Sequence, residues 1–157
     1  MKITEIDMAK QAFIYGAIHI LANRLQIVGD KIDPTISTKQ WFVLAVVSKF
    51  KEAPPNIGDI ATELGTSRQN IKKMANILEQ RGFLKLEKDK SDKRIINLFL
   101  TEQCRNYFKG REQQEKEYIE NIFLGVDDKM LDMLYNGMGM LIKNIDALLE
   151  NNVNMER

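Results

Sequence analysis

Apolar residues near the start of the chain recur at the spacing of an α-helix. From Glu5 to Val28 they form two adjacent stripes, and the combined face is wider than a single neighbouring helix would cover. Gly29 and Asp30 follow and are predicted to end the helix. The pattern therefore predicts one long helix with more than one packing partner. Its apolar residues are Ile6, Phe13, Ala17, Ile20 and Ile27, and beside them Ile14, Ile18, Leu21, Leu25 and Val28.

Capping signals mark the starts of two further helices. Ser37, with Gln40 three residues later, matches a capping box and predicts a helix that runs to about Phe50. The β-branched run inside this segment would by itself suggest a strand. After a pair of prolines, Asn56 and Asp59 repeat the same three-residue spacing and predict another helix start.

The segment that follows has the pattern of a helix-turn-helix. A short helix over 57–64 is followed by Gly65, which fits the left-handed residue that ends many helices. Thr66 or Ser67 caps the next helix, which is predicted to run to Arg81. The residues of the two helices that are predicted to be buried are Ile57, Ile60, Ala61, Leu64, Ile71, Met74, Ala75 and Leu78.

Two apolar runs then predict a β-hairpin. They cover 83–88 and 95–100, and the polar loop 89–94 lacks the Asn-Gly dipeptide of a two-residue turn, so it is expected to be longer and to project. The predicted fold class is mainly α with a small β-hairpin wing. A helix-turn-helix followed by a basic hairpin fits duplex DNA, with a helix for the major groove and a wing for the minor groove.

The second helix of the pair carries a polar face opposite its buried face. Arginine and lysine can reach guanine edges or phosphates, and glutamine and asparagine can pair with adenine. The alternative is a face that is merely solvated, which is the usual fate of such residues. The candidate DNA-binding residues of this segment are Ser67, Arg68, Gln69, Asn70, Lys72, Lys73 and Asn76.

The predicted wing is rich in cations around its tip. A narrow minor groove concentrates negative potential and attracts such side chains, arginine in particular. Asp89 and Asp92 are expected to bind loop amides or to hold the arginine in position. The candidate DNA-binding residues of the wing are Lys90, Asp92, Lys93 and Arg94.

The charge distribution supports the same segment. The net charge is only +1, but residues 39–100 hold 12 basic and 7 acidic side chains, whereas residues 101–157 hold 7 and 11. A positive excess is what phosphate binding with counterion release would favour. An accidental distribution of solvated side chains is the alternative on charge alone.

Composition excludes several classes of protein. The 157 residues are 44% hydrophobic and 29% charged, which is ordinary for a globular chain, and no apolar run is long enough for a bilayer. The first ten residues lack the features of a signal peptide, and the single cysteine, Cys104, fits a reducing compartment, so a cytoplasmic protein without membrane contact is expected. One histidine and one cysteine cannot form the usual metal clusters, and no phosphate-binding glycine loop or nucleophile elbow is present. No enzyme activity, metal or cofactor is predicted.

The C-terminal third predicts helices suited to self-association. A long helix is expected from Thr101, and its middle, 109–117, has no apolar residue, as in a helix that bridges two packed bodies. Further on, apolar residues recur at close to heptad spacing, which suits packing against another helix. A monomeric helical tail is the alternative. The heptad residues are Leu131, Leu134, Met138, Leu141, Ile145 and Leu148.

Residues from about Ser37 to Leu100 resemble the MarR family of bacterial winged helix-turn-helix transcriptional regulators. The matching segments are 38–41, 60–65 and 78–84, and the wing signature Asp-x-Arg-Asp-x-Arg appears as 89–94. The first arginine of that signature is Ser91 here, which leaves the minor-groove role to Arg94 with help from Lys90 or Lys93. Leu100-Thr101 matches the usual start of the next helix, but Cys104 stands where the family often has glycine.

The resemblance implies a homodimer that reads a pseudo-palindromic operator in double-stranded DNA, more often as a repressor than as an activator. It implies dimerisation segments at 1–36 and 101–157 around a DNA-binding domain at 37–100. Family members often bind a small aromatic or anionic effector between the dimer helices and the winged helix, which here points to Tyr15, His19 and Trp41. The plainer interpretation is that Trp41 belongs to the core and that His19 only packs against a helix.

Two alternatives remain open from the sequence. One is a redox-responsive regulator that uses Cys104, since a thiol near a helix N-terminus can have a lowered pKa, although buried inert cysteines are commoner. The other is a winged helix that binds protein and has no specific affinity for DNA. That class predicts weak DNA binding, whereas a regulator binds its operator far more tightly than random duplex.

Overall fold

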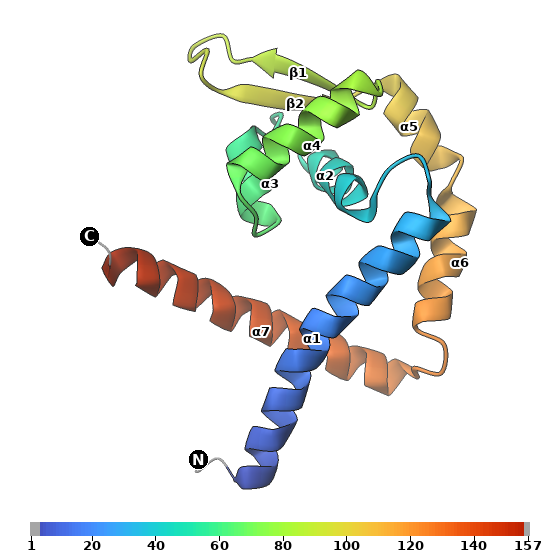
Figure 1. The fold of residues 1–157 in the computed structure, drawn as a ribbon, viewed down its shortest axis with the longest axis vertical. Helices are drawn as coiled ribbons and strands as arrows, with labels where there is room; N and C mark the ends of the chain where they lie inside the picture. Colours follow the sequence, from blue (N-terminus) through green and yellow to red (C-terminus); the bar gives the residue numbers. More distant parts are fainter. Residues whose placement is uncertain (1–3, 156–157) are drawn as a thin grey trace. The chain divides into compact units, whose positions relative to one another are not determined.

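The computed structural model describes residues 4–155 of the chain and divides it into two compact units, with the boundary between Lys109 and Gly110 (Figure 1). Within the described residues, the predicted fold class is confirmed: the chain is mainly helical with one antiparallel hairpin. The elements are α1 (Glu5–Ile32), α2 (Thr38–Lys49), α3 (Ile57–Glu63), α4 (Arg68–Gln80), β1 (Leu84–Lys88), β2 (Ile96–Leu100), α5 (Glu102–Lys109), α6 (Glu112–Ile122) and α7 (Asp128–Met155).

Helix α1 is longer than predicted, because Gly29 and Asp30 lie inside its last turns. A Cβ atom on Gly29 would stand 2.4 Å from the Thr38 hydroxyl, so this glycine permits close contact with the start of α2. The Asp30 carboxylate accepts a hydrogen bond from the Thr38 amide at 2.6 Å. The prediction of a helix end at these residues was wrong, because both residues join α1 to α2 instead.

The loop between α1 and α2 is fixed by contacts with later elements of the same unit. Asp33 is buried and accepts hydrogen bonds from the Thr35 amide and from the hydroxyl of Tyr107 on α5. The Arg81 guanidinium donates to the Thr35 carbonyl. The C-terminal end of α1 is therefore held against the winged helix, whereas none of the described α1 residues is buried.

The predicted caps form as expected. Ser37 and Gln40 make a reciprocal capping box at the start of α2, and Asn56 and Asp59 make another at the start of α3. The β-branched run of α2 is helical, since the helix cap and burial of one face outweigh the strand preference. Gly65 has φ +59°, which ends α3 and allows the turn into α4.

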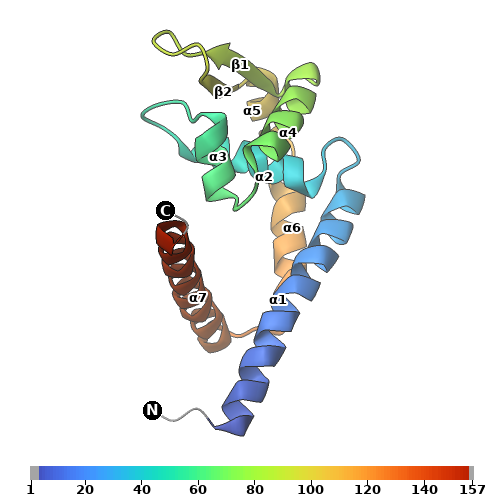
Figure 2. The same ribbon diagram turned by 60° about the vertical axis from the view of Figure 1, so that its left-hand side comes forward.

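Ser67, and not Thr66, caps α4, because its hydroxyl accepts a hydrogen bond from the Asn70 amide at 3.2 Å. The helix ends before Gly82, which has φ +77° and leads directly into β1. Figures 1 and 2 show the loop between the two strands extending away from α2, α3 and α4.

The hairpin pairs Leu84 with Leu100 and Lys88 with Ile96. On its other edge, β2 contacts the segment that precedes α3: the Leu98 amide donates to the Pro55 carbonyl at 2.9 Å. The structure thus adds a short third pairing to the hairpin, which the sequence pattern did not indicate.

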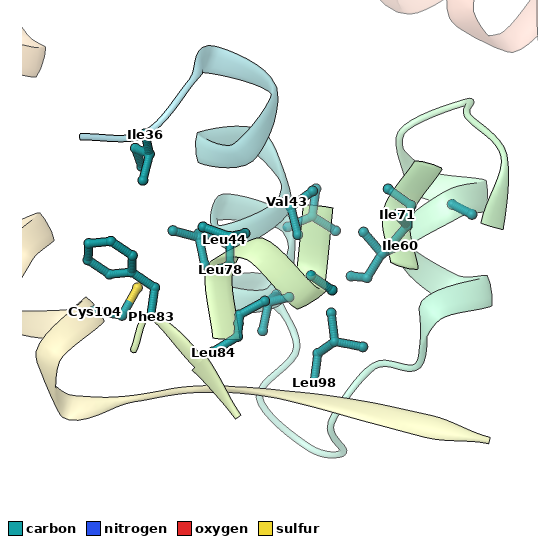
Figure 3. Close-up of a cluster of buried hydrophobic side chains, with 14 residues drawn as sticks. Ile36, Val43, Leu44, Ile60, Ile71, Leu78, Phe83, Leu84, Leu98 and Cys104 are labelled. Atoms are coloured by element: carbon teal, nitrogen blue, oxygen red, sulfur yellow. The ribbon is translucent and has the colours of Figure 1, made fainter. Parts of the chain in front are cut away.

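The core of the first unit lies between α2, α4 and the hairpin (Figure 3). Leu44, Leu78 and Leu98 are almost completely buried there, with Ile60 and Ile71 at the α3 side. Three residues predicted to be buried are only half-buried at the edge of this core: Ile57, Leu64 and Met74. They stand at the rim because the two short helices leave one side of each residue open to solvent.

The long helix predicted from Thr101 is interrupted. Helix α5 ends at Lys109 and α6 begins at Glu112, with a turn at Gly110 and Arg111. Glycine disfavours a helix interior by about 1 kcal/mol relative to alanine, which favours a break at Gly110. The break falls within the segment that was predicted to be a polar bridge.

The second unit consists of α6 and α7, which are joined by a turn at Gly125 with φ +82°. Leu131, Leu134 and Ile145 are among the exposed apolar residues of α7. In the part of the chain that the structure describes, no helix has both the length and the apolar character to cross a membrane.

Candidate nucleic-acid interface

The polar face of α4 is exposed, as the sequence predicts. Residues at the spacing i, i+1, i+4, i+5 and i+8 share one side of a helix, and the buried residues Ile71, Ala75 and Leu78 occupy the opposite side. The exposed face presents both guanidinium and ammonium donors together with side-chain amides. Its residues are Arg68, Gln69, Lys72, Lys73 and Asn76.

Arg68, the first residue of α4, lies against the start of α3. A Cβ atom on Gly58 would stand 3.4 Å from its Nε and 2.9 Å from the Asn56 side-chain oxygen. The absence of a side chain at Gly58 therefore leaves room for the arginine beside the α3 cap. This role of Gly58 was missed in the sequence, where a glycine in the first turn of a helix gave no such signal.

Two candidate residues of the turn also have structural roles. The Ser67 hydroxyl caps α4, and the Asn70 side-chain amide donates to the Thr66 hydroxyl at 3.3 Å. Asn70 stands at the edge of the polar face, between that face and the buried side. The structure thus groups Ser67 and Asn70 with the turn and the other α4 candidates with the open face.

The wing loop is organised around the Asp89 carboxylate. One of its oxygens accepts hydrogen bonds from the amide and hydroxyl of Ser91 and from the amide of Asp92. These bonds, those from Ser91 first, lower the pKa of Asp89 well below its usual range. The prediction that the loop aspartates bind loop amides is confirmed.

Arg94 is held by Asp92 at the tip of the wing. Its Nε and Nη2 donate to the two carboxylate oxygens of Asp92 at 3.1 and 3.0 Å, while 91% of its side-chain surface stays exposed. The paired guanidinium lowers the pKa of Asp92. Lys90 and Lys93 are also exposed. The wing therefore presents an oriented arginine with two lysines nearby.

The three residues considered for an effector site lie in different surroundings. Tyr15 and His19 are exposed on α1, with ring centroids 4.9 Å apart, and the Tyr15 carbonyl is 3.1 Å from the His19 Nδ1. Trp41 packs at the edge of the winged-helix core, edge-on to Phe42 and Phe108.

Cys104 is fully buried in the core, and Figure 3 shows it at the same end as Phe83 and Ile36. Burial raises the pKa of its thiol to about 11. A neutral buried thiol is a poor nucleophile, so this environment does not suit a redox sensor. Within residues 4–155, no cluster of three or more histidine, cysteine or carboxylate side chains is arranged to hold a metal ion.

Asn97 is a second residue that the sequence pattern did not single out. It is the second residue of β2, and its side-chain amide donates to the Asp89 carboxylate at 3.2 Å. The available signal was a polar residue between two apolar ones in a predicted strand, where asparagine is disfavoured.

Comparisons with known proteins connect this geometry to one family. No curated protein sequence matches the chain. Residues 33–95, from the start of the α1–α2 loop through the wing, match the model described as MarR family.

Solved structures of regulators share the fold over most of the chain. A MarR transcriptional regulator from Methanosarcina mazei Go1 aligns with a TM-score of 0.77 at 24% identity, over 87% of this chain and 99% of that one. The S. aureus MepR–DNA complex gives 0.74 at 13% identity, over 83% and 96%. A Bordetella bronchiseptica BpsR structure, whose subject is regulation of DNA binding by 6-hydroxynicotinic acid, gives 0.68 at 15% identity, over 81% and 91%.

At these identities the solved structures show the fold, and the family match rests on the central segment whose helix caps, turn and wing have been described. Residues 33–95 thus resemble the MarR family, and most of the chain shares the fold of solved MarR-family transcriptional regulators.

Proposed function

We propose that the protein is a homodimeric, sequence-specific DNA-binding transcriptional regulator that acts as a repressor. Helix α4 enters the major groove and the wing enters the minor groove of a pseudo-palindromic operator. The observation that carries the proposal is the oriented, exposed Arg94 on the same compact unit as the open polar face of α4. Together they offer groove-specific donors on two elements of one domain.

The charge of the domain supports the proposal. The positive excess of residues 39–100 includes the cations of α4 and of the wing, and such an excess attracts a polyanion. The fold of a structure determined with DNA, that of S. aureus MepR, also covers most of this chain. These points favour DNA over a protein partner.

The proposed dimer is supported by the apolar surface that the single chain leaves open. Helix α7 presents an apolar seam at heptad spacing, which suits a second copy of the chain. The proposed dimerisation segments are 1–36 and 101–157, on either side of a DNA-binding domain at 37–100. A dimer supplies two recognition helices for two half-sites about one helical turn apart.

A small aromatic or anionic effector is the proposed signal, and Tyr15, His19 and Trp41 are its candidate contacts. Their chemistry supports this proposal, since an aromatic pair on α1 and an indole edge offer apolar walls and a titratable group. Replacing His19 with alanine should weaken the response to such an effector, while basal DNA binding stays unchanged. An unchanged response would exclude this residue.

Selection of binding sites from random duplex DNA tests the proposed function most directly. The purified protein should enrich a pseudo-palindrome and bind it at least a thousandfold more tightly than random duplex at the same salt concentration. Recovery of no preferred sequence, with weak binding throughout, would favour a winged helix that binds protein.

A further inference from the structure

Near the start of β2, one residue contacts three parts of the winged helix. Asn97 pairs with Glu87 of β1 in the hairpin, and on its other side its backbone forms a bridge with Asn56, next to the Leu98–Pro55 hydrogen bond. Its half-buried side chain donates to the wing residue Asp89. One asparagine thus joins both strands, the start of α3 and the wing loop.

From Asn97, a continuous series of hydrogen bonds leads to the wing arginine. Asn97 binds one oxygen of Asp89, and the other oxygen binds the amide of Asp92. Asp92 in turn accepts both hydrogen bonds from the Arg94 guanidinium. The orientation of the Asp89 carboxylate is therefore fixed from the strand side by Asn97, and it fixes the residue that holds Arg94.

In the other direction, the same asparagine reaches the recognition helix. Its bridge partner Asn56 caps α3 through the amides of Gly58 and Asp59 at 2.7 and 3.2 Å. The Arg68 side chain of α4 lies beside this cap, over Gly58. Arg94 and Arg68, one for each groove, are thus both positioned relative to the segment where β2 meets the start of α3.

We propose that Asn97 is a positioning residue for DNA recognition, which sets the wing arginine relative to the recognition helix through Asp89 and Asp92. The inference rests on the proposed DNA-binding function. Loss of the Asn97 donor leaves the backbone of the hairpin intact but detaches the second Asp89 oxygen from the strand, so that only the bonds within the loop hold this carboxylate. The loop that carries Arg94 is then less firmly fixed, and the entropy of ordering it must be supplied when DNA binds.

Three variants test the proposal. Asn97→Leu removes the donor at nearly constant size. Asn97→Asp places two carboxylates against each other. The exchange Asp89→Asn/Asn97→Asp restores a donor and an acceptor in reversed order, and it keeps the net charge and composition of the natural chain. The exchange is therefore the matched control for both single variants.

The first measurement is made without DNA. The NMR signal of the Arg94 Nε–H group should show increased fast motion in Asn97→Leu and Asn97→Asp, and natural order in the exchange variant. Backbone signals of α4 should not change. An Arg94 signal that is unchanged in both single variants would overturn the proposal. If Asn97→Leu folds poorly, the comparison of Asn97→Asp with the exchange variant still tests it.

The second measurement is the salt dependence of binding to the selected DNA site. Asn97→Leu should weaken binding while leaving the slope of log affinity against log salt nearly unchanged, because Arg94 keeps its charge, and it should add nothing in an Arg94→Ala background, which by itself lowers the slope by about one. Additive effects would show that Asn97 acts independently of Arg94 and would overturn the proposal. If the natural protein itself selects no DNA site, the proposed function fails, whereas the free-protein NMR result still shows whether Asn97 orders Arg94.

Discussion

At the scale of single residues, the wing depends on how one exposed cation is held. Arg94 has almost all of its side chain in solvent, yet both carboxylate oxygens of Asp92 accept its hydrogen bonds. An exposed ion pair adds little to stability, because water and salt screen it. Its effect lies in orientation, since a guanidinium already aimed outward loses less entropy when it binds a groove.

Replacing Arg94 with alanine should therefore weaken binding to every DNA sequence and reduce the salt slope by about one. Replacing Gln69, on the open face of α4, should instead cost roughly 1–3 kcal/mol at particular base positions. Fluorescence anisotropy at several salt concentrations, with a panel of operator variants, separates the two effects. Equal behaviour of both variants would contradict the assignment of wing and helix to different grooves.

Cys104 should be chemically inert in the folded protein. Burial raises the pKa of its thiol from 9.0 to about 11, so the thiolate is rare at neutral pH. The unfolded chain loses this proton at a lower pH than the folded chain. The folded protein therefore keeps its full stability below pH 9 and loses part of it as the pH rises toward 11. Alkylation by iodoacetamide at pH 7.5 should be much slower in the native than in the unfolded protein. Peroxide should release DNA equally, or not at all, from the natural protein and from Cys104→Ser. A selective effect on the natural protein would restore the redox alternative.

At the scale of elements, the junction of α1 with α2 is set by a close contact. Gly29 faces the Thr38 hydroxyl within a helix that could otherwise tolerate a larger residue. Helix propensity alone predicts that Gly29→Ala stabilises α1 by about 1 kcal/mol. The overlap with Thr38 predicts the opposite sign.

We expect Gly29→Ala to destabilise the protein by about 1–3 kcal/mol, as overpacking does elsewhere. In a Thr38→Ala background, where the hydroxyl is absent, the same change should be neutral or stabilising. Chemical denaturation of the four proteins of this cycle measures the coupling. A stabilising effect of Gly29→Ala in the natural background would contradict the close contact at this junction.

At the scale of the whole molecule, the second unit exposes many large apolar side chains to solvent. Ile145 of α7 has a relative exposure of 52% in the single chain, and the neighbouring seam residues Leu134 and Leu148 are also exposed. An exposed apolar seam of this kind usually marks an interface. A partner copy that covers it would also explain the glycines Gly137 and Gly139, where an added Cβ atom would meet nothing from other parts of the described chain within 4 Å.

Ile145→Glu should therefore produce monomers and lower the affinity for the palindromic site at least tenfold, while affinity for an isolated half-site changes little. Because Ile145 is exposed in the single chain, the substitution costs the isolated chain little, and its effect must come from the partner. Asn136→Glu, which adds the same charge on the same helix, is the control. Light scattering gives the oligomeric state, and a dimeric Ile145→Glu variant would place the interface elsewhere.

Local signals predicted much of the first unit. The capping boxes at Ser37 and Asn56 and the left-handed Gly65 depend on residues three or four positions apart, so the sequence indicates them directly. The same is true of the Asp92–Arg94 pair, which is two residues apart. These features fix the order of helices, turn and wing.

Contacts between distant segments could not be predicted in this way. Gly29 looked like a helix end because only Thr38 in space reveals why glycine is needed there. Asn97 was not singled out in the sequence, because its contact with Asp89 becomes visible only in the folded chain. The sequence left open whether the Cys104 thiol is reactive, and its burial in the core makes it inert.

The sequence by itself thus determined the winged helix-turn-helix and its candidate DNA-binding side chains, because helix periodicity, caps and turn residues act over a few positions. The tertiary structure decided how the wing arginine is held, where α1 ends, and which strand residue contacts the wing loop. These properties arise from packing and hydrogen bonds between segments that the chain brings together only when it folds.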